Sequence, residues 1–211
     1  MGSDFKKIAV IIKRLRSRYP VVNTQLDHKT PFQLLIATIM SAQCTDRQVN
    51  QVTRVLFFHY PDPLSLANAP LEDIKRIIYS TGFYNNKAKN IKACAQKLLE
   101  DFNGKVPEKI DLLTTLPGVG RKTANLVRSV SFKIPTIVVD THVKRLAFRL
   151  GLSDQTDPEK VEFELMDIIP ESSWNDLCLQ LIYLGREICD ARHPLCPDCF
   201  LNDICPAHGI G

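Results

Sequence analysis

The sequence predicts an all-α fold, for three reasons. Apolar residues recur at helical spacing in most segments, for example in residues 4–19, 32–41 and 172–188. Helix-start signals are frequent: Thr30-Pro31 and Thr156-Asp157-Pro158-Glu159 each place a capping side chain before a proline. No segment alternates apolar and polar residues as a strand would. We therefore expect roughly ten helices joined by short loops.

Length and composition describe an ordinary globular protein with a mild basic excess. The chain has 211 residues, enough for one large domain or two small ones, and 45% of them are hydrophobic. The net charge of +4 permits nucleic-acid binding without requiring it. No secretory signal precedes the first helix, and no apolar stretch approaches the ~20 residues of a membrane span. We therefore expect an intracellular protein whose seven cysteines are metal ligands or free thiols.

The first half of the chain contains a buried helix and a polar patch after it. Residues 4–19 form an amphipathic helix whose basic side we interpret as a solvated face. Residues 32–41 are apolar nearly all round, which predicts a helix inside the core. In the polar patch that follows, Thr45 or Asp46 can cap the next helix. Capping gives no role to Gln43.

Short helices are expected at residues 64–68 and 71–79, between prolines. The turn Gly82–Ala88 then begins a helix that ends at Asn103-Gly104, a C-cap signal. Phe83 lies in that turn. It is either a core residue or an exposed wedge, and the sequence leaves both open.

The segment Leu116–Ala124 indicates two helices joined by a tight hairpin. Gly118 and Gly120 can adopt positive φ, so successive backbone N–H groups can form an anion cradle at the start of the second helix. Lys122 lies in the first turn of that helix, where the electropositive helix end favours a neutral amine. Such an arrangement suits covalent chemistry on nucleic acid. A plain helix–helix turn with a solvated lysine is the simpler alternative.

Asp140 directly precedes the predicted helix of residues 141–151. Aspartate is a common N-cap, because its carboxylate accepts hydrogen bonds from the first helical N–H groups. A functional carboxylate can occupy the same position. The sequence therefore allows a structural role, a chemical role or both.

Four cysteines near the C-terminus form a C-x6-C-x2-C-x5-C pattern: Cys189, Cys196, Cys199 and Cys205. Four thiolates this close can hold a tetrahedral zinc ion or one cubane iron–sulfur cluster. The first gap is long for a zinc module, so the spacing favours the cluster. We interpret the other three cysteines, Cys44, Cys94 and Cys178, as structural.

Together these motifs resemble endonuclease III, a family of helix-hairpin-helix DNA glycosylases with an iron–sulfur cluster. The resemblance covers nearly the whole chain and is carried by five features: Ser41-Ala42-Gln43 with Asp46, Gly82–Ala88, Leu116–Ala124, Val139-Asp140-Thr141-His142, and the four cysteines. It implies two helical domains flanking a DNA-binding cleft. Residues 24–135 would form a six-helix barrel containing the hairpin, and residues 1–23 with 136–211 the iron–sulfur cluster domain.

The resemblance also implies a bifunctional glycosylase and abasic-site lyase of base excision repair. Such an enzyme removes oxidised pyrimidines from damaged double-stranded DNA and nicks 3′ to the abasic site by β-elimination through a lysine Schiff base. Lys122 would be the nucleophile and Asp140 the essential carboxylate, while the four cysteines would hold a [4Fe-4S] cluster. Gln43 would fill the gap left by the flipped base. Phe83 would be the wedge on the opposite strand, a position where the family often has an aliphatic residue.

Further DNA contacts implied by the resemblance lie in the Gly82–Ala88 turn, the hairpin and the segment after Asp140: Asn85, Lys87, Leu116, Gly118, Val119, Gly120, Arg121 and His142. The expected protein is a monomer that binds damaged DNA, does not bind membranes, and acts in the cytoplasm or nucleoid if prokaryotic.

Three alternative functions use parts of the same pattern. A related adenine glycosylase of oxidised-guanine mismatches lacks the hairpin lysine and breaks no strand, so Lys122 argues against it. A non-catalytic DNA-binding module would use the hairpin but leave Lys122 and Asp140 without a joint role. An electron-transfer protein would use the cysteine cluster but would not need the basic hairpin.

Overall fold

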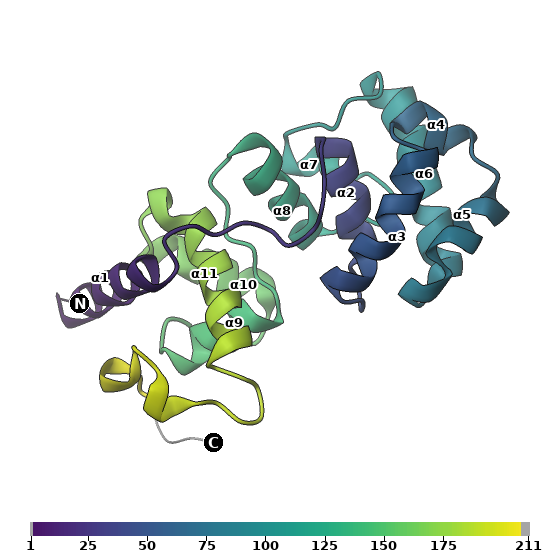
Figure 1. The fold of residues 1–211 in the computed structure, drawn as a ribbon. Helices are drawn as coiled ribbons and strands as arrows, with labels where there is room; N and C mark the ends of the chain where they lie inside the picture. The colour runs from purple at the N-terminus through teal and green to yellow at the C-terminus, as the bar shows by residue number, and fades with distance from the viewer. Residues whose placement is uncertain (1, 208–211) are drawn as a thin grey trace. The chain divides into compact units, whose positions relative to one another are not determined.

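A computed structural model describes residues 2–207, with side chains from residue 6 onward. Residue 1 and residues 208–211, which the predicted cluster domain includes, lie outside the described residues. Within the described range the chain forms eleven α-helices and four short 3₁₀ helices, and no β-strand (Figure 1). The prediction of an all-α fold is confirmed.

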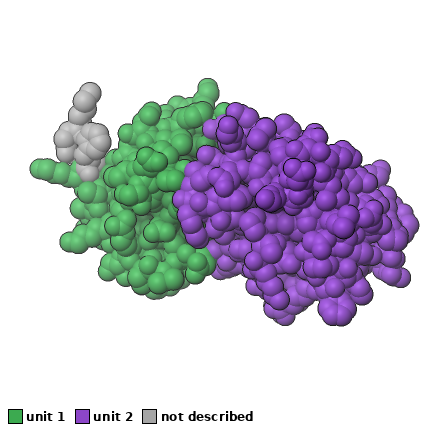
Figure 2. Space-filling model, turned by 90° about the horizontal axis from the view of Figure 1, so that it is seen from above, with its two compact units in different colours: residues 1–23, 135–211 green, residues 24–134 purple. Residues whose placement is uncertain are grey.

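The chain folds into two compact units, which Figure 2 shows in different colours. One unit is continuous and consists of residues 24–134. The other is discontinuous, because residues 1–23 join residues 135–211. The first helix of the chain therefore packs with the last third of the sequence.

Seven α-helices build the unit of residues 24–134: α2 (Pro31–Met40), α3 (Asp46–His59), α4 (Pro63–Asn68), α5 (Leu71–Ile78), α6 (Tyr84–Phe102), α7 (Ile110–Leu113) and α8 (Arg121–Phe132), with the 3₁₀ helix η1 (Tyr79–Thr81) before α6. Helix α2 packs against α3, α6 and α8. Contact on several sides explains why α2 is apolar nearly all round, and nine of its ten residues are buried.

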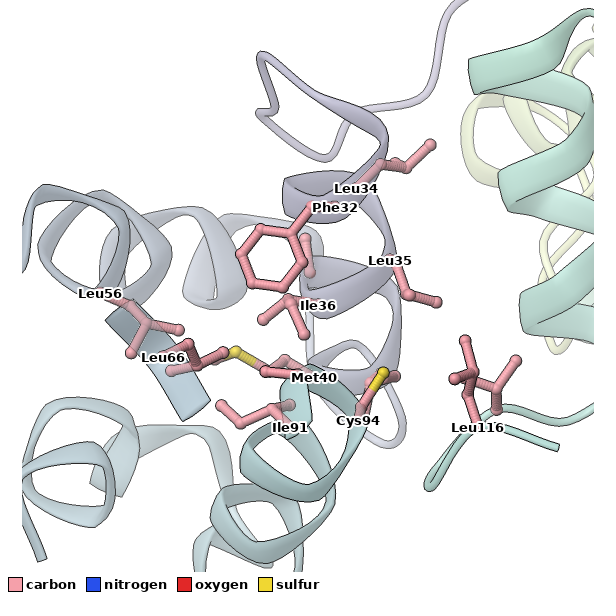
Figure 3. Packing of buried hydrophobic residues seen from close by; sticks show 14 of the residues in the cluster. Phe32, Leu34, Leu35, Ile36, Met40, Leu56, Leu66, Ile91, Cys94 and Leu116 are labelled. Carbon is pink, nitrogen blue, oxygen red and sulfur yellow. The ribbon is translucent and has the colours of Figure 1, made fainter. Parts of the chain in front are cut away.

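The core of this unit forms around α2. Figure 3 shows Phe32, Ile36 and Met40 of α2 on the side where Leu56 and Leu66 lie. Leu35 points the other way, toward the side of Leu116 in the hairpin. Leu116 is 2% exposed, so the hairpin is anchored in the same core as α2.

Local caps set the starts of several helices. The Thr30 hydroxyl accepts a hydrogen bond of 3.2 Å from Gln33 N at the start of α2. Thr45, rather than Asp46, caps α3, because its hydroxyl accepts from Gln48 N at 3.3 Å. This decides between the two capping residues that the sequence allows.

The described residues of the discontinuous unit form four α-helices and three short 3₁₀ helices: α1 (Gly2–Arg18), α9 (Thr141–Arg149), α10 (Pro158–Ile168), η2 (Glu171–Ser173), α11 (Trp174–Glu187), η3 (Cys196–Asp198) and η4 (Asn202–Ile204). Helix α11 packs against α1 and α9, and α10 packs against α9. The buried segment 136–139 leads directly into α9. It positions Asp140, the residue just before that helix.

The basic side of α1 holds the C-terminal part of the unit. Lys7 Nζ donates to the Leu150 carbonyl at 2.7 Å, and Arg14 Nη1 donates to the Phe200 carbonyl at 2.9 Å. Arg14 also forms an ion pair with Asp203. The expectation of a simply solvated basic face is therefore wrong for these two side chains, because their partners lie far along the sequence.

Candidate active site and metal centre

The hairpin between α7 and α8 is a tight turn fixed by its own backbone. Leu116 N donates to Leu113 O and Val119 N donates to Leu116 O, both at 3.1 Å. Gly118 has φ +78°, and a Cβ there would lie 3.0 Å from both Ile39 Cγ2 and Asn90 Cβ. Only glycine fits this combination of backbone angle and close approach. The turn is therefore pressed against α2 and α6 at a defined point.

Two predicted DNA-contact residues of the hairpin are core residues. The Leu116 and Val119 side chains are 2% and 7% exposed, and their N–H groups form the turn. Any contact of these two residues with DNA would therefore use the backbone of the hairpin and not their side chains. They hold the hairpin in place, and its exposed parts are Gly118 and Gly120.

Gly120, the second glycine of the hairpin, leaves the N-terminus of α8 without a capping side chain. Gly120 is the N-cap of α8 with φ −94° and ψ 177°, so only Gly118 has the positive φ that was allowed for both glycines. A Cβ at Gly120 would meet nothing within 4 Å. Because glycine has no side chain, it cannot cap the first N–H groups of α8. This helix end is electropositive and suited to an anion.

Lys122 lies on this helix end as predicted from the sequence. It occupies the first turn of α8 and its side chain is exposed, while Arg121 beside it is half-buried. An exposed primary amine next to an anion-binding helix end can reach a sugar carbon attached to a bound phosphate. The geometry allows the nucleophilic role without requiring a buried lysine.

Gln43 and Phe83 share an uncommon backbone conformation. Their φ angles are +52° and +49°, in the left-handed region that favours glycine. Both side chains are exposed, and Phe83 is 66% exposed. Of the two possibilities that the sequence leaves open for Phe83, a core residue or an exposed one, the structure shows the exposed residue. Strained backbone of this kind concentrates at functional sites.

The residues around Phe83 differ in their availability. Asn85 is exposed in the first turn of α6. Lys87 is only 5% exposed, and its ammonium donates to the Thr81 carbonyl at 2.8 Å. The predicted contact between Lys87 and DNA is therefore corrected, because its charged group is used inside the protein.

Asp140 is the N-cap of α9. Its carboxylate Oδ1 accepts a hydrogen bond of 2.7 Å from Val143 N, and the residue is half-buried. Upstream, Val138 N donates to Cys178 Sγ at 3.2 Å, which fixes the approach to the helix. One carboxylate oxygen caps the helix. The negative charge of the group remains available for chemistry.

His142 packs against α11 two residues later. A Cβ on Gly185 would lie 2.7 Å from His142 Nδ1, so the close approach of these helices requires glycine. His142 Nδ1 lies 3.2 Å from Arg145 Nη2, which also donates to the carbonyl groups of Gly185 and Cys189. The half-buried ring is thus held by α11. Neither Gly185 nor Arg145 could be identified from the sequence, because both roles depend on contacts between distant segments.

The four clustered cysteines line one cavity. They are half-buried, and the other lining residues are mainly apolar side chains of α9, α11 and the C-terminal segment, including Leu146, Leu184 and Leu201. Burial, followed by the negative charge of the neighbouring thiolates, raises the pKa values of Cys199 and Cys205. A positively charged inorganic centre would relieve that repulsion.

Arg149 of α9 is a further residue of this centre. Its Nη1 donates to Cys189 Sγ at 3.3 Å and to the Asp190 carbonyl at 2.6 Å, and its Nη2 donates to the Ala191 carbonyl at 2.9 Å. These bonds fix the chain directly after the first cysteine.

The chemistry of four thiols around one cavity can be compared with the needs of a single ion and of a cluster. Across the described residues, no group of three or more His, Cys, Asp or Glu side chains is placed to hold a metal ion. Tetrahedral zinc binds each sulfur at about 2.3 Å and so needs sulfurs only about 4 Å apart. A cubane is wider, because each thiolate binds a different iron. Four cysteines around one cavity are a donor set that a cubane can use.

The remaining cysteines have structural environments. Cys94 and Cys178 are 0% and 2% exposed, and burial raises the pKa of each thiol to about 12. Cys44, next to Gln43, is half-buried. The Cys94 and Cys178 thiols, with these raised pKa values, are poor nucleophiles near neutral pH.

The predicted site residues are divided between the two units. Gln43, Phe83, the hairpin and Lys122 belong to residues 24–134. Asp140, His142 and the four cysteines belong to the discontinuous unit. In the described part of the chain, no helix combines the length and apolar content needed to cross a membrane.

Comparisons with known proteins agree with this arrangement. Residues 36–171 match the family of HhH-GPD superfamily base excision DNA repair proteins. Endonuclease III of Synechocystis sp. (strain ATCC 27184 / PCC 6803 / Kazusa) is 48% identical over 208 residues, which cover 98% of this chain and 95% of that protein.

Solved structures give the same result. A non-covalent endonuclease III–DNA complex is 43% identical, with a TM-score of 0.91 and coverage of 96% of this chain and 95% of that one. A trapped endonuclease III–DNA covalent intermediate, an estranged-adenine complex, has the same TM-score, identity and coverage.

The chain belongs to the endonuclease III family. It is therefore a DNA glycosylase of base excision repair, which confirms the resemblance on which the sequence prediction was based.

Proposed function

We propose that the chain removes oxidised pyrimidines from damaged double-stranded DNA and then nicks the strand 3′ to the abasic site. The observation that carries the proposal is Lys122, an exposed amine in the first turn of α8, two residues after Gly120, which gives the helix no capping side chain. Relatives of 43% identity have been solved with DNA, one as a trapped covalent intermediate, which supports covalent chemistry on DNA here.

The chemistry follows from an amine attacking a sugar carbon. The damaged base leaves the helical stack, because the C1′ atom is unreachable inside the duplex. Lys122 Nζ, as the free amine, bonds to C1′ while the bond from C1′ to the base nitrogen breaks and the base leaves with the electron pair. Loss of a proton from nitrogen and opening of the sugar ring give an imine. Removal of a C2′ proton then breaks the bond from C3′ to its oxygen and releases the 3′-phosphate.

Asp140 supplies negative charge to this reaction. Its carboxylate accepts a proton from the Lys122 ammonium or stabilises the cationic sugar, and either role requires the ionised group. The helix cap made by Oδ1 fixes the orientation of the side chain. The proposal requires Lys122 and Asp140 to reach the same deoxyribose in the complex with DNA.

DNA binding uses backbone groups and exposed side chains. The N–H groups at the start of α8 hold a phosphate without reading sequence. Gln43 fills the gap left by the flipped base, and the exposed Phe83 ring enters the opposite strand, since apolar side chains can wedge between base steps. Asn85, Arg121 and His142 complete the proposed contacts.

We assign a [4Fe-4S] cluster to Cys189, Cys196, Cys199 and Cys205. When bound, the cluster cross-links the C-terminal segment through four iron–sulfur bonds. Arg149 and Arg145 hold the chain around Cys189 from α9, so they support the ligand segment from outside the cysteine loop. On this proposal residues 24–135 are the barrel domain, and residues 1–23 with 136–211 the cluster domain of a monomer acting on DNA in the cytoplasm or nucleoid.

A direct assay tests the proposed substrate. Purified protein is incubated with duplexes that contain thymine glycol, an abasic site or an A·8-oxoguanine mismatch. The proposal predicts base release and strand cleavage at thymine glycol and cleavage at the abasic site. Adenine release without cleavage would instead support the mismatch glycosylase, and binding without either reaction would support a non-catalytic module.

A further inference from the structure

A buried lysine lies next to the exposed Phe83 loop. Lys87 is 5% exposed, and its ammonium donates to the Thr81 carbonyl at 2.8 Å. Lysine is rarely buried unless its charge has a partner, because removing an ammonium from water is costly. Burial lowers the pKa of Lys87, and the charge of Cys44 acts against this shift. The role of this buried lysine therefore depends on the Thr81 carbonyl that its ammonium binds.

Lys87 holds the Phe83 loop at two points. Its ammonium binds the Thr81 carbonyl, and its backbone N–H donates to the Phe83 carbonyl at 3.1 Å. These two carbonyls bracket Gly82 and Phe83, whose φ angles are +68° and +49°. A bulky residue persists in the left-handed region only where the surrounding structure fixes it. The Lys87 ammonium provides that fixation before Gly82, and the first backbone hydrogen bond of α6, which does not depend on the lysine side chain, provides it after Phe83.

Other bonds hold the residues before the loop. The Thr81 hydroxyl donates to the Ile78 carbonyl at 2.8 Å, and Gln48 Nε2 donates to Ser80 Oγ at 2.6 Å. Thr81 itself is 2% exposed. The exposed Phe83 ring is therefore carried by a short loop on a fixed base.

We propose that Lys87 is a positioning residue that presents Phe83 in the conformation in which the ring enters damaged DNA. The inference rests on the proposed function, in which Phe83 is the wedge. A loop fixed in advance spares the cost of ordering it during binding. Lys87 acts through Phe83 and does not contact DNA, which replaces its predicted role as a DNA contact.

The variant Lys87→Met removes the ammonium and keeps a long apolar side chain. Lys92→Met is the matched control, because Lys92 lies on the same helix α6 and its ammonium donates to the Ala69 carbonyl, away from Phe83. Phe83→Ala and the double variant Lys87→Met/Phe83→Ala complete a double-mutant cycle. If Lys87→Met is insoluble, Lys87→Gln replaces it in the same cycle.

Three measurements separate positioning from a general loss of stability. They are kcat/KM on a thymine glycol duplex, the fluorescence of 2-aminopurine opposite the lesion as a report of unstacking, and the salt dependence of binding to undamaged DNA. We expect Lys87→Met to lower kcat/KM about tenfold and to reduce the fluorescence increase, as relief of a strained conformation predicts. Lys92→Met stays within about twofold of the unmodified protein, and the salt dependence is unchanged because no phosphate contact is lost.

The double-mutant cycle also defines the results that would contradict the inference. In the Phe83→Ala background, Lys87→Met should add less than about a twofold loss, because the two residues act as one unit. A full tenfold loss in that background, or equal behaviour of Lys87→Met and Lys92→Met, would overturn the inference. If Lys87→Met reduced the slope of log binding constant against log salt concentration by about one, Lys87 would be a phosphate contact and the inference would be overturned. If the unmodified protein forms no borohydride-trapped adduct with an abasic duplex, the proposed function fails independently of Lys87.

Discussion

Replacing Asp140 separates its two roles, because the cap and the charge respond to different substitutions. Asp140→Asn keeps a side-chain oxygen for the 2.7 Å hydrogen bond from Val143 N but removes the negative charge. Asp140→Ala removes both. Asparagine and aspartate are nearly equivalent N-caps, whereas alanine at this position costs about 1 kcal/mol.

The stability effects follow from the size of the chain. An unfolding entropy of about 2.1 cal/mol/K per residue corresponds to a shift in Tm of about 2 °C for each kcal/mol in a chain of 211 residues. The lost interaction of the carboxylate with the α9 dipole is worth about 0.5 kcal/mol. We therefore expect Tm to fall by about 1 °C in Asp140→Asn and by about 3 °C in Asp140→Ala.

The activity effects follow a different pattern. Both variants should lose a factor of about 100 or more in base release, as expected when an ionised group that handles a proton is removed. The assay is single-turnover base release from a thymine glycol duplex, with Tm measured by circular dichroism on the same samples. A fully active Asp140→Asn protein would reduce Asp140 to a helix cap. Inactivation of Asp140→Asn with a large fall in Tm would show that the substitution disturbs the fold.

Three further predictions concern the hairpin and the cysteines. Gly118→Val should weaken DNA binding and lower stability, because a β-branched residue resists the φ of +78°, while Gly120→Ala should fold normally; equal affinities in gel-shift titrations would remove the hairpin from the interface. Cys199→Ser should lower the soluble yield and iron content more than it alters the lyase activity of the folded fraction; the unmodified protein should contain about four irons and four sulfides, and a colourless, active zinc protein would contradict this. Since burial raises the pKa values of Cys94 and Cys178 to about 12, their stabilising effect is complete below the unfolded thiol pKa of about 8.5 and declines as pH rises toward 12. Denaturant titrations of Cys→Ala variants between pH 8 and pH 11 measure this decline, and a difference that does not change with pH contradicts the assignment.

Local signals in the sequence predicted most of the helices. Helix α8 begins after the hairpin glycines, where the sequence predicts the second helix, because glycine signals a turn that is visible without the fold. The burial of α2 also follows from its composition. The cap made by Asp140 is equally local, since it depends on a hydrogen bond three residues along the chain.

Roles that depend on distant segments were not predictable in the same way. Lys87 resembles an exposed helix-start lysine, and its partner Thr81 O is brought to it only by the Gly82 turn. One signal was present: Lys87 precedes the buried Ile91 and Cys94 at helical spacing, on the core side of α6. Arg149 gave no such signal, because its bonds to the cysteine segment span about forty residues.

The left-handed backbone conformation of Phe83 could not be predicted from the sequence either. Gly82 predicts a turn, and an aromatic residue after it is disfavoured at positive φ. The sequence therefore allowed a core residue as readily as an exposed ring. The bond from the Lys87 ammonium to the Thr81 carbonyl, which exists only in the folded chain, stabilises the exposed arrangement together with the first backbone bond of α6.

The nature of the bond between protein and DNA tests the central claim most directly. If Lys122 forms an imine with C1′, borohydride reduces it and leaves a covalent protein–DNA adduct, which peptide mass mapping should place at Lys122. Lys122→Ala should bind damaged DNA without releasing the base efficiently or forming the adduct, and Lys122→Gln should behave alike, because an amide nitrogen is not nucleophilic. An adduct that maps to another residue, or a Lys122→Ala protein that is active and still trapped, would contradict the mechanism.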